Sequence, residues 1–172
     1  MLSCAEVAVF IDETSYSKIE DNEIGRRVVY NIRKPLGLMG VPYDVFLSSD
    51  FEEVKNNYKA YISLVPTETK LSSIIKDYAR DVGIAYLEIN KMNCDILPND
   101  LRKFAKNAGA FIYSNKNAVV YANTSFVFLH IAEDGVQDFN IPGATDYKEI
   151  FENKYYSREF HGKVGESYLF KR

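Results

Sequence analysis

Polar side chains follow three apolar stretches of this sequence and are the first candidates for chemistry. Asp12 and Glu13 end the first stretch, Ser48 follows the second, and Thr67 stands shortly after the third. If these stretches are parallel strands, the four residues share the carboxyl edge of one sheet, where open α/β sheets bind their ligands. The pattern therefore indicates a possible ligand crevice in which two acids and two hydroxyls would hold a small molecule.

A metal-dependent interpretation of this edge lacks a required residue. The paired acids Asp12 and Glu13 resemble the metal-binding acids of response-regulator receiver domains. That family also needs a phosphoacceptor Asp after the third strand, where this chain has Pro66 and Thr67. Lys116 is only loosely placed for the receiver lysine. We therefore expect no divalent metal, and the alternative role of the acids is to cap a helix from a solvated turn.

A flavin-binding interpretation lacks a required residue as well. Residues 13–18 are rich in hydroxyls, as is the loop with which a flavodoxin binds the flavin phosphate. The glycine that lets backbone amides close on a phosphate is absent from this segment, and Gly25 comes only later. We therefore predict no flavin and no other cofactor.

The cysteines and histidines do not form a catalytic pattern. A nucleophilic Cys needs a base such as His within reach, and both histidines lie in the second half of the chain. Cys94 is expected to be a free thiol, at the surface or half-buried, and Cys4 a small core residue. His130 lies in an apolar strand and should be buried and hydrogen-bonded, whereas His161, beside Gly162, is expected in a surface turn. We predict no catalytic residue and no metal ligand.

Aromatic side chains offer a second kind of candidate. The chain has 13 Tyr and 11 Phe but no Trp. Four of the rings fall in the expected β region and would stack sugars, form an interface or pack in a core: Tyr113, Tyr121, Phe126 and Phe128.

Composition bounds the class of protein. The 172 residues suggest one domain or two small ones, and a hydrophobic fraction of 47% allows a sizeable core. A formal net charge of −3 gives no reason to expect nucleic acid or an anionic membrane as partner. Two cysteines cannot form a disulfide framework, and the N-terminus does not resemble a signal peptide. We therefore expect a cytoplasmic protein without a membrane span.

Strands and helices alternate over the first 90 residues or so. Four apolar stretches are typical of strands that a sheet buries on both faces: residues 5–11, 43–47, 61–65 and 84–89. Between them the sequence predicts helices, one capped by Asp21 or Asn22 and ended or kinked near Lys34 by Pro35, and one from residue 51 to about 57. This alternation is typical of βαβ units and a parallel sheet.

The third strand and the helix after it give the clearest local signal. Thr67 or Thr69 is a suitable N-cap, and Gly83 stands at the usual position just after a helix. Between them, apolar residues recur at spacings of three and four, as on the buried face of a helix: Leu71, Ile74, Ile75, Tyr78 and Val82.

The rhythm changes after a further helix that is expected at residues 98–108. Only short apolar stretches follow, which predict an antiparallel sheet: residues 111–114, 118–122, 125–132, 136–141, 147–151, 155–160 and 167–171. Asp134-Gly135 is a strong hairpin signal and Asn123-Thr124 a weaker one. Residues 111–114 would alternatively add a fifth parallel strand. We expect a flavodoxin-like α/β domain over residues 1–109, a small antiparallel β domain over residues 110–172, and one cooperative unit with the helix at 98–108 packed between them.

The order of several segments resembles a known family. Three early pieces look like the trimerisation domain of family 42 glycoside hydrolases: residues 5–13, 39–50 and 58–64. That domain has a class I glutamine-amidotransferase-like, flavodoxin-like fold. Four later pieces resemble the helix and the β domain that follow it in that family: residues 101–109, 119–126, 129–135 and 165–170. The resemblance covers most of the chain. Each piece is a packing pattern, so the specificity lies in their order.

The resemblance implies a role without catalysis in the isolated chain. In that family the two catalytic glutamates lie in a TIM barrel, which needs about 250 residues, and the amidotransferase nucleophile would fall at the Pro66-Thr67 corner. The resemblance therefore implies a non-catalytic structural and oligomerisation module of a β-galactosidase-like protein, a homo-oligomer with a trimer favoured, and an upstream barrel as partner. The alternative is a small-molecule-binding or enzymatic flavodoxin-like domain that uses Asp12, Glu13 and Ser48.

Overall fold

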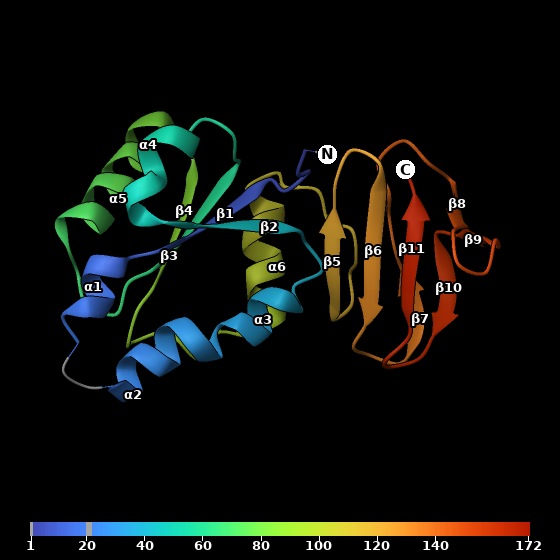
Figure 1. Ribbon diagram of the computed structural model, residues 1–172, viewed down its shortest axis with the longest axis horizontal. Helices are drawn as coiled ribbons and strands as arrows, with labels where there is room; N and C mark the ends of the chain where they lie inside the picture. The colour runs from blue at the N-terminus through green and yellow to red at the C-terminus, as the bar shows by residue number, and fades with distance from the viewer. Residues whose placement is uncertain (1, 20–21) are drawn as a thin grey trace.

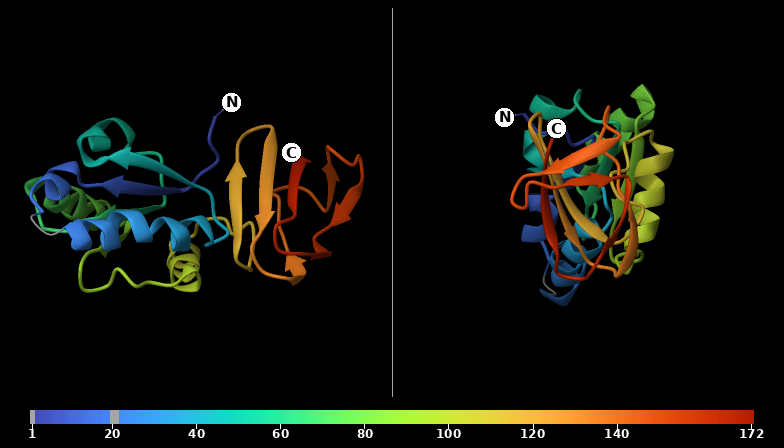
Figure 2. Two further views of the ribbon diagram at one scale, coloured as in Figure 1. Left: turned by 60° about the horizontal axis from the view of Figure 1, so that its bottom comes forward. Right: turned by 90° about the vertical axis from the view of Figure 1, so that its right-hand side faces the viewer.

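A computed structural model describes residues 2–19 and 22–172 of the chain (Figure 1). Asp21, one of the two expected helix caps, lies outside the described residues. The described part consists of a parallel sheet with helices on both faces and a small antiparallel β domain beside it, as Figure 2 shows from two further directions. The α/β fold class that we expected from the alternation of strands and helices is therefore confirmed.

The parallel sheet has four strands in the order β2-β1-β3-β4. They match the four expected apolar stretches: β1 Val7–Ile11, β2 Tyr43–Leu47, β3 Ala60–Leu64 and β4 Ala85–Ile89. Val9 at the centre of β1 pairs with Val45 of β2 and with Ile62 of β3. The order places β1 between its neighbours in the flavodoxin-like manner and leaves β2 and β4 at the two edges.

Successive side chains of β1 enter two different cores because strand side chains alternate between the faces of a sheet. The helices are α1 Glu13–Ser17, α2 Asn22–Gly25, η1 Arg26–Asn31, α3 Arg33–Gly37, η2 Ser48–Asp50, α4 Phe51–Val54, α5 Lys70–Val82 and α6 Pro98–Asn107. Val7 and Val9 pack in a cluster with residues of η1, α3 and α6, whereas Ala8 and Phe10 pack against α4 and α5. This explains why the strand is apolar on both faces.

Helix α5 forms as its sequence predicts. Thr69 is the N-cap: its hydroxyl accepts a hydrogen bond from the Ser72 amide, and the Ser72 hydroxyl in turn accepts one from the Thr69 amide. Of the two threonines considered, Thr69 is therefore the cap and Thr67 is not. Gly83 ends the helix with a φ of 74°, which a residue without a Cβ adopts at little cost.

The segment between β1 and β2 differs from the expected single helix. Helix α2 passes directly into the π-helix η1, Arg26–Asn31, and the chain resumes an α-helix only at Arg33. The helical segment is thus interrupted at Ile32, close to the expected position near Lys34, and Pro35 lies in the first turn of α3, where its missing amide hydrogen costs nothing. Helix α1, directly after β1, was not expected either, and the helix at residue 51 stops at Val54 rather than near residue 57.

The β domain contains two antiparallel sheets rather than the single one that we expected. A five-stranded sheet has the order β5-β6-β11-β8-β9, and β7 pairs with β10 in a two-stranded sheet. The strands are β5 Ala118–Ala122, β6 Phe126–Ile131, β7 Gly135–Asp138, β8 Asp146–Glu149, β9 Tyr155–Ser157, β10 Glu159–Gly162 and β11 Ser167–Lys171. The expected strand at residues 155–160 is thus divided, because β9 and β10 belong to different sheets.

The two turn signals have unexpected outcomes. The weaker one, Asn123-Thr124, forms a true hairpin, since β5 pairs with β6 and the Asn123 amide donates to the Phe126 carbonyl at 3.0 Å. The stronger one, Asp134-Gly135, joins β6 to β7, and these strands belong to different sheets. A turn sequence specifies a local change of direction, but the strand pairing depends on which apolar face each strand buries.

Residues 111–113 form neither a fifth parallel strand nor an antiparallel one, so both expectations for this segment are wrong. They connect α6 to the β domain, and Ser114 makes only an isolated bridge with Phe139. The amides of Tyr113 and Ser114 donate to the Gly40 carbonyl at 3.2 and 3.1 Å. The connector is therefore attached to the turn after α3 instead of to the sheet.

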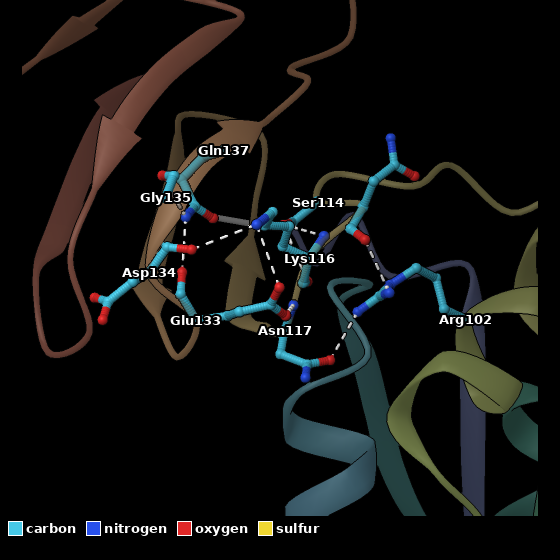
Figure 3. A network of polar contacts seen from close by, with 9 residues as sticks. Arg102, Ser114, Lys116, Asn117, Glu133, Asp134, Gly135 and Gln137 are labelled. Atoms are coloured by element: carbon cyan, nitrogen blue, oxygen red, sulfur yellow. Dashed lines mark hydrogen bonds and ion pairs between the residues drawn. The ribbon is translucent and has the colours of Figure 1, made fainter.

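A buried arginine links the α/β part to the β domain. Arg102 of α6 is 8% exposed, and its guanidinium donates to the carbonyls of Leu38, Met39 and Asn115 and to Asn117 Oδ1. Figure 3 shows Arg102 with Asn117 and, beside them, a second group in which Lys116 contacts Glu133 and the Asp134 carbonyl. Helix α6 thus packs at the junction, as the sequence suggested.

Candidate functional site

Asp12 is the central residue of the carboxyl edge, and both its oxygens bind protein groups. Its Oδ1 accepts a hydrogen bond from the Ser15 amide at 2.8 Å, so Asp12 is the N-cap of α1. Its Oδ2 accepts a hydrogen bond from the hydroxyl of Thr69, which is the N-cap of α5. The side chain is completely buried. Asp12 therefore joins the starts of two helices, a capping role as in the alternative interpretation, although in a buried rather than a solvated position.

Glu13 serves a similar purpose on the other side of β1. Its carboxylate accepts from the amides of Ser48 and Ser49 at 3.0 and 3.1 Å, at the start of η2. Partial burial raises the pKa of Glu13, but hydrogen bonds from its own amide and from Ser49 and Ser48 outweigh it, so the net pKa lies below the usual value. The ionised carboxylate is the form that these donors favour.

The structure thus brings Asp12, Glu13, Ser48 and Thr67 to one edge, as predicted. Thr67 is exposed, and its amide donates at 2.6 Å to the hydroxyl of Ser15. Within the described residues, the Ser48 hydroxyl is buried and has no hydrogen-bond partner. The acids are therefore engaged in helix starts, and Ser48 offers one buried polar atom that the fold does not use.

The remaining candidates lie apart from one another. Cys94 is buried at 6% exposure, deeper than expected, whereas Cys4 is half-buried rather than a core residue. His130 is half-buried in β6 and its Nδ1 lies 2.8 Å from the Ser167 hydroxyl, so it is hydrogen-bonded but not buried. His161 is exposed, in strand β10 rather than in a turn. In residues 2–19 and 22–172 no group of three His, Cys, Asp or Glu is placed to hold a metal, and no helix is long and apolar enough to cross a membrane.

A hollow lies elsewhere in the molecule, at a place that the sequence did not indicate. A groove of about 830 Å³ runs between the segment η1–α3 and strands β2 and β5. Its sides carry the rings of Tyr30, Tyr43 and Tyr121 and the cations Arg33 and Lys34. Of the four aromatic residues considered, only Tyr121 lines this groove: Tyr113 is buried in the β-domain core, and Phe126 and Phe128 are half-buried.

A second hollow of about 460 Å³ continues the first one along the junction of the two domains. The two share Arg33, Lys34, Gly37 and Val119, and the second extends to His130. Helical residues 30–34 and strand residue 121 come close only through the packing of α3 against β5, which explains why no local motif marks the site. We call the two hollows together the junction groove.

Comparison with known proteins gives matches by structure only. No protein-family model and no curated protein matches the sequence. The β-galactosidase from Bacillus circulans sp. alkalophilus has a TM-score of 0.62 at 12% identity, over 99% of this chain and 42% of that one. A catalytic mutant of Gan42B, a GH42 β-galactosidase from G. stearothermophilus, has 0.64 at 10%, over 100% of this chain and 41% of that one.

A GH42 exo-carrageenase from Bacteroides ovatus is also similar. Its TM-score is 0.60 at 11% identity, over 98% of this chain and 29% of that one. The chain therefore spans less than half the length of these solved structures. At 10–12% identity the similarity concerns the fold alone. The chain has the fold of one part of the GH42 β-galactosidases.

Proposed function

We propose that this chain is a non-catalytic structural and oligomerisation module of a β-galactosidase-like, carbohydrate-active protein. The observation that carries the proposal is the coverage of the structural matches, which include nearly all of this chain but at most 42% of each enzyme. Under this proposal residues 1–109 form the trimerisation, glutamine-amidotransferase-like domain, residues 110–172 form the β domain that follows it, and a TIM barrel is the upstream partner. We further propose that the module acts in the cytoplasm.

The isolated chain should not hydrolyse aryl galactosides or glutamine. Glycoside hydrolysis needs two carboxylates on either side of the scissile bond, and Asp12 and Glu13 instead accept hydrogen bonds from helix starts. A steady-state assay of the purified chain should give no turnover above buffer. Turnover that disappears in Glu13→Gln or Cys94→Ser would refute the non-catalytic role and favour the alternative of an active flavodoxin-like domain.

Self-association is the second part of the proposal. Beside the contacts between copies of residues 1–109 that the resemblance implies, an exposed apolar group at the far end of the β domain offers an additional contact surface. Ile150, Phe151 and Tyr155 are exposed by 38%, 75% and 71% around the turn between β8 and β9. Grouped apolar side chains of this size are typical of contact surfaces. A repeated contact between this turn and a different surface of the next copy forms a ring when the rotation between copies closes, and a rotation of one third of a turn would give the trimer that we favour.

We expect a homo-oligomer in sedimentation equilibrium at about 100 µM, well above the micromolar range of a weak specific complex. Phe151→Ser and Tyr155→Ser should each shift the distribution toward monomer, by about tenfold or more in dissociation constant. Met92→Ser is the matched control, because Met92 is equally apolar and 84% exposed but lies in the loop after β4. A strictly monomeric parent chain would refute self-association, and an unchanged Phe151→Ser distribution would exclude this surface.

A further inference from the structure

We propose that the junction groove binds a saccharide that carries an anionic group, sulfate or carboxylate. The choice of a saccharide rests on the proposed carbohydrate-related function, whereas the anionic group follows from the groove itself. This ligand is not one that the proposed oligomerisation role requires.

The dimensions of the groove suit a ligand of a few sugar rings. Its two parts hold about 830 and 460 Å³, and small-molecule sites usually measure about 300–1,000 Å³. Because the parts meet at Arg33, Lys34, Gly37 and Val119, a chain of two or three rings would extend from one into the other.

Aromatic rings stand on both sides of the groove. Tyr30 of η1 is 60% exposed and Tyr121 of β5 is 65% exposed, while Tyr43 of β2, which also lines the groove, is half-buried. The ring of Tyr121 leans on Phe128 at 6.2 Å between centroids, and the Arg33 guanidinium lies 4.7 Å from the centre of the Tyr30 ring. Rings that are held in place but open on one face are suited to stacking against the apolar face of a sugar, with the hydroxyl available for hydrogen bonds.

The charge of the groove is opposite to that of the chain. The protein has 24 acidic and 21 basic residues, yet Arg33 and Lys34 line both parts, His130 lines one, and no Asp or Glu lines either part. Within the described residues, neither Arg33 nor Lys34 makes a salt bridge. Burial raises the pKa of the Tyr43 hydroxyl, with Tyr121 acting in the same direction and Arg33 against it. All three residues line the first part of the groove. Two cations without carboxylate partners beside hydroxyls are suited to an anionic substituent.

The backbone of the groove wall is itself unusual. Residues 26–31 form a π-helix of six residues, a form that is rare in proteins and frequent at functional sites. The wider turn buries Val28 in the core and leaves Tyr30 and Asn31 exposed along the groove. The energetic cost of this irregular helix is explained if the exposed side chains bind a ligand.

A nucleotide would also combine a stacking ring with negative charge, but the groove fits it less well. Phosphates bind preferentially to free amides at a helix start or in a glycine-rich loop. Helix α3 follows η1 with only Ile32 between them, and the Leu36 amide already donates to the Ile32 carbonyl at 3.0 Å. We therefore favour the saccharide and treat the nucleotide as an outcome of the test.

The test is a calorimetric titration of the full chain with five probes: galactobiose, the same disaccharide carrying one sulfate, the same disaccharide carrying one carboxylate, inorganic sulfate, and AMP. One of the two anionic disaccharides should bind about tenfold tighter than each of the other three probes, or about 1.4 kcal/mol. The stronger of the two arms identifies the anion. Equal affinity for the neutral disaccharide, equal affinity for sulfate alone, tighter binding of AMP, or no binding at all would each overturn the proposal.

Variants locate the site. Lys34→Ala and Tyr121→Ala remove exposed side chains, so the fold should be unaffected, while affinity for the anionic disaccharide should fall about tenfold. Lys76→Ala and Tyr16→Ala, exposed on α5 and α1, are the matched controls and should bind as the parent does. Full affinity in Lys34→Ala or Tyr121→Ala would exclude the junction groove. Binding does not depend on turnover or assembly, so failure here is distinguishable from failure of the proposed function.

Discussion

Gly40→Ala should destabilise the protein by about 3–5 kcal/mol, from a strained backbone and an overlap with a neighbouring chain segment. Gly40 has a φ of 72°, in the left-handed region that side chains with a Cβ disfavour. A Cβ at this position would also overlap the Ser114 carbonyl oxygen. A clash with backbone cannot be relieved by a rotamer change, so one segment must move.

The movement would break the contacts that hold the two domains together. The Gly40 carbonyl accepts from the amides of Tyr113 and Ser114, and the preceding residue, Met39, bridges to Ala118 at the start of β5. Displacing Ser114 therefore breaks the hydrogen bonds from the Tyr113 and Ser114 amides to the Gly40 carbonyl. Each buried polar group that is left without a partner costs about 1–3 kcal/mol.

Substitutions at two other glycines separate the cost of the strained backbone from the cost of the overlap. The measurement is urea unfolding followed by circular dichroism. Gly83→Ala has the same positive φ, at 74°, but no atom within 4 Å of a new Cβ, so it should lose only about 1–2 kcal/mol. Gly37→Ala has neither feature and lies in a helix, so it should be neutral or stabilise by up to about 1 kcal/mol. A Gly40→Ala loss no larger than that of Gly83→Ala would show that the overlap has no cost.

Arg102→Met should destabilise the protein by about 2–4 kcal/mol, because one buried and three part-buried acceptors lose a charged donor. The guanidinium donates to three carbonyls, of Leu38, Met39 and Asn115, and to the side chain of Asn117. The hydrogen bond to Asn117 can be followed in Figure 3. Burial lowers the pKa of Arg102, although a guanidinium stays protonated in proteins. Met fills the space without replacing any of these hydrogen bonds.

The shape of the guanidinium matters as well as its charge. Arg102→Lys keeps the charge but has three donors on one atom, which cannot reach the carbonyls of Leu38, Met39 and Asn115 at once, so it should recover less than half of the loss. Arg80→Met is the control: Arg80 pairs with Asp77 at 3.0 Å but its side chain is 70% exposed, and its loss should stay within about 0.5 kcal/mol. The same urea titration measures all three. A loss for Arg102→Met as small as that for Arg80→Met would refute the linking role of this residue.

The helix with local signals at both ends could be predicted almost to the residue, whereas the helix between β1 and β2 could not. For α5, capping at Thr69 and termination at Gly83 are local effects, because they depend on side-chain hydrogen bonds and backbone freedom within a few residues. The π-helix η1 has no such signal. Its apolar residues Ile24, Val28 and Ile32 recur every four positions, as in an ordinary α-helix. The wider π-helical turn is seen only in the structure, where Val28 is buried in the core and Tyr30 is exposed.

At the carboxyl edge of the sheet, too, one part could be predicted from the sequence and another part could not. The position of Asp12 and Glu13 at the end of a strand, and hence beside Ser48 and Thr67, follows from the βαβ pattern. The contacts that tie these acids to the starts of α5 and η2 do not, because Thr69, the N-cap of α5, lies 57 residues from Asp12 and meets it only when β1 and β3 pair.

Local physical chemistry alone was sufficient for the apolar strands, for helix α5 and for the class of fold, since each depends on periodicity and on residues close in sequence. Strand pairing in the β domain, the link through Arg102 and the junction groove needed the tertiary structure. At Asp134-Gly135 the turn residues were present, yet β6 pairs with β5 and β11, because burial of Val127, Leu129 and Ile131 determines its partners. Arg33 and Tyr121 likewise share one groove only because α3 packs on β5, a contact between residues nearly ninety positions apart that no local pattern encodes.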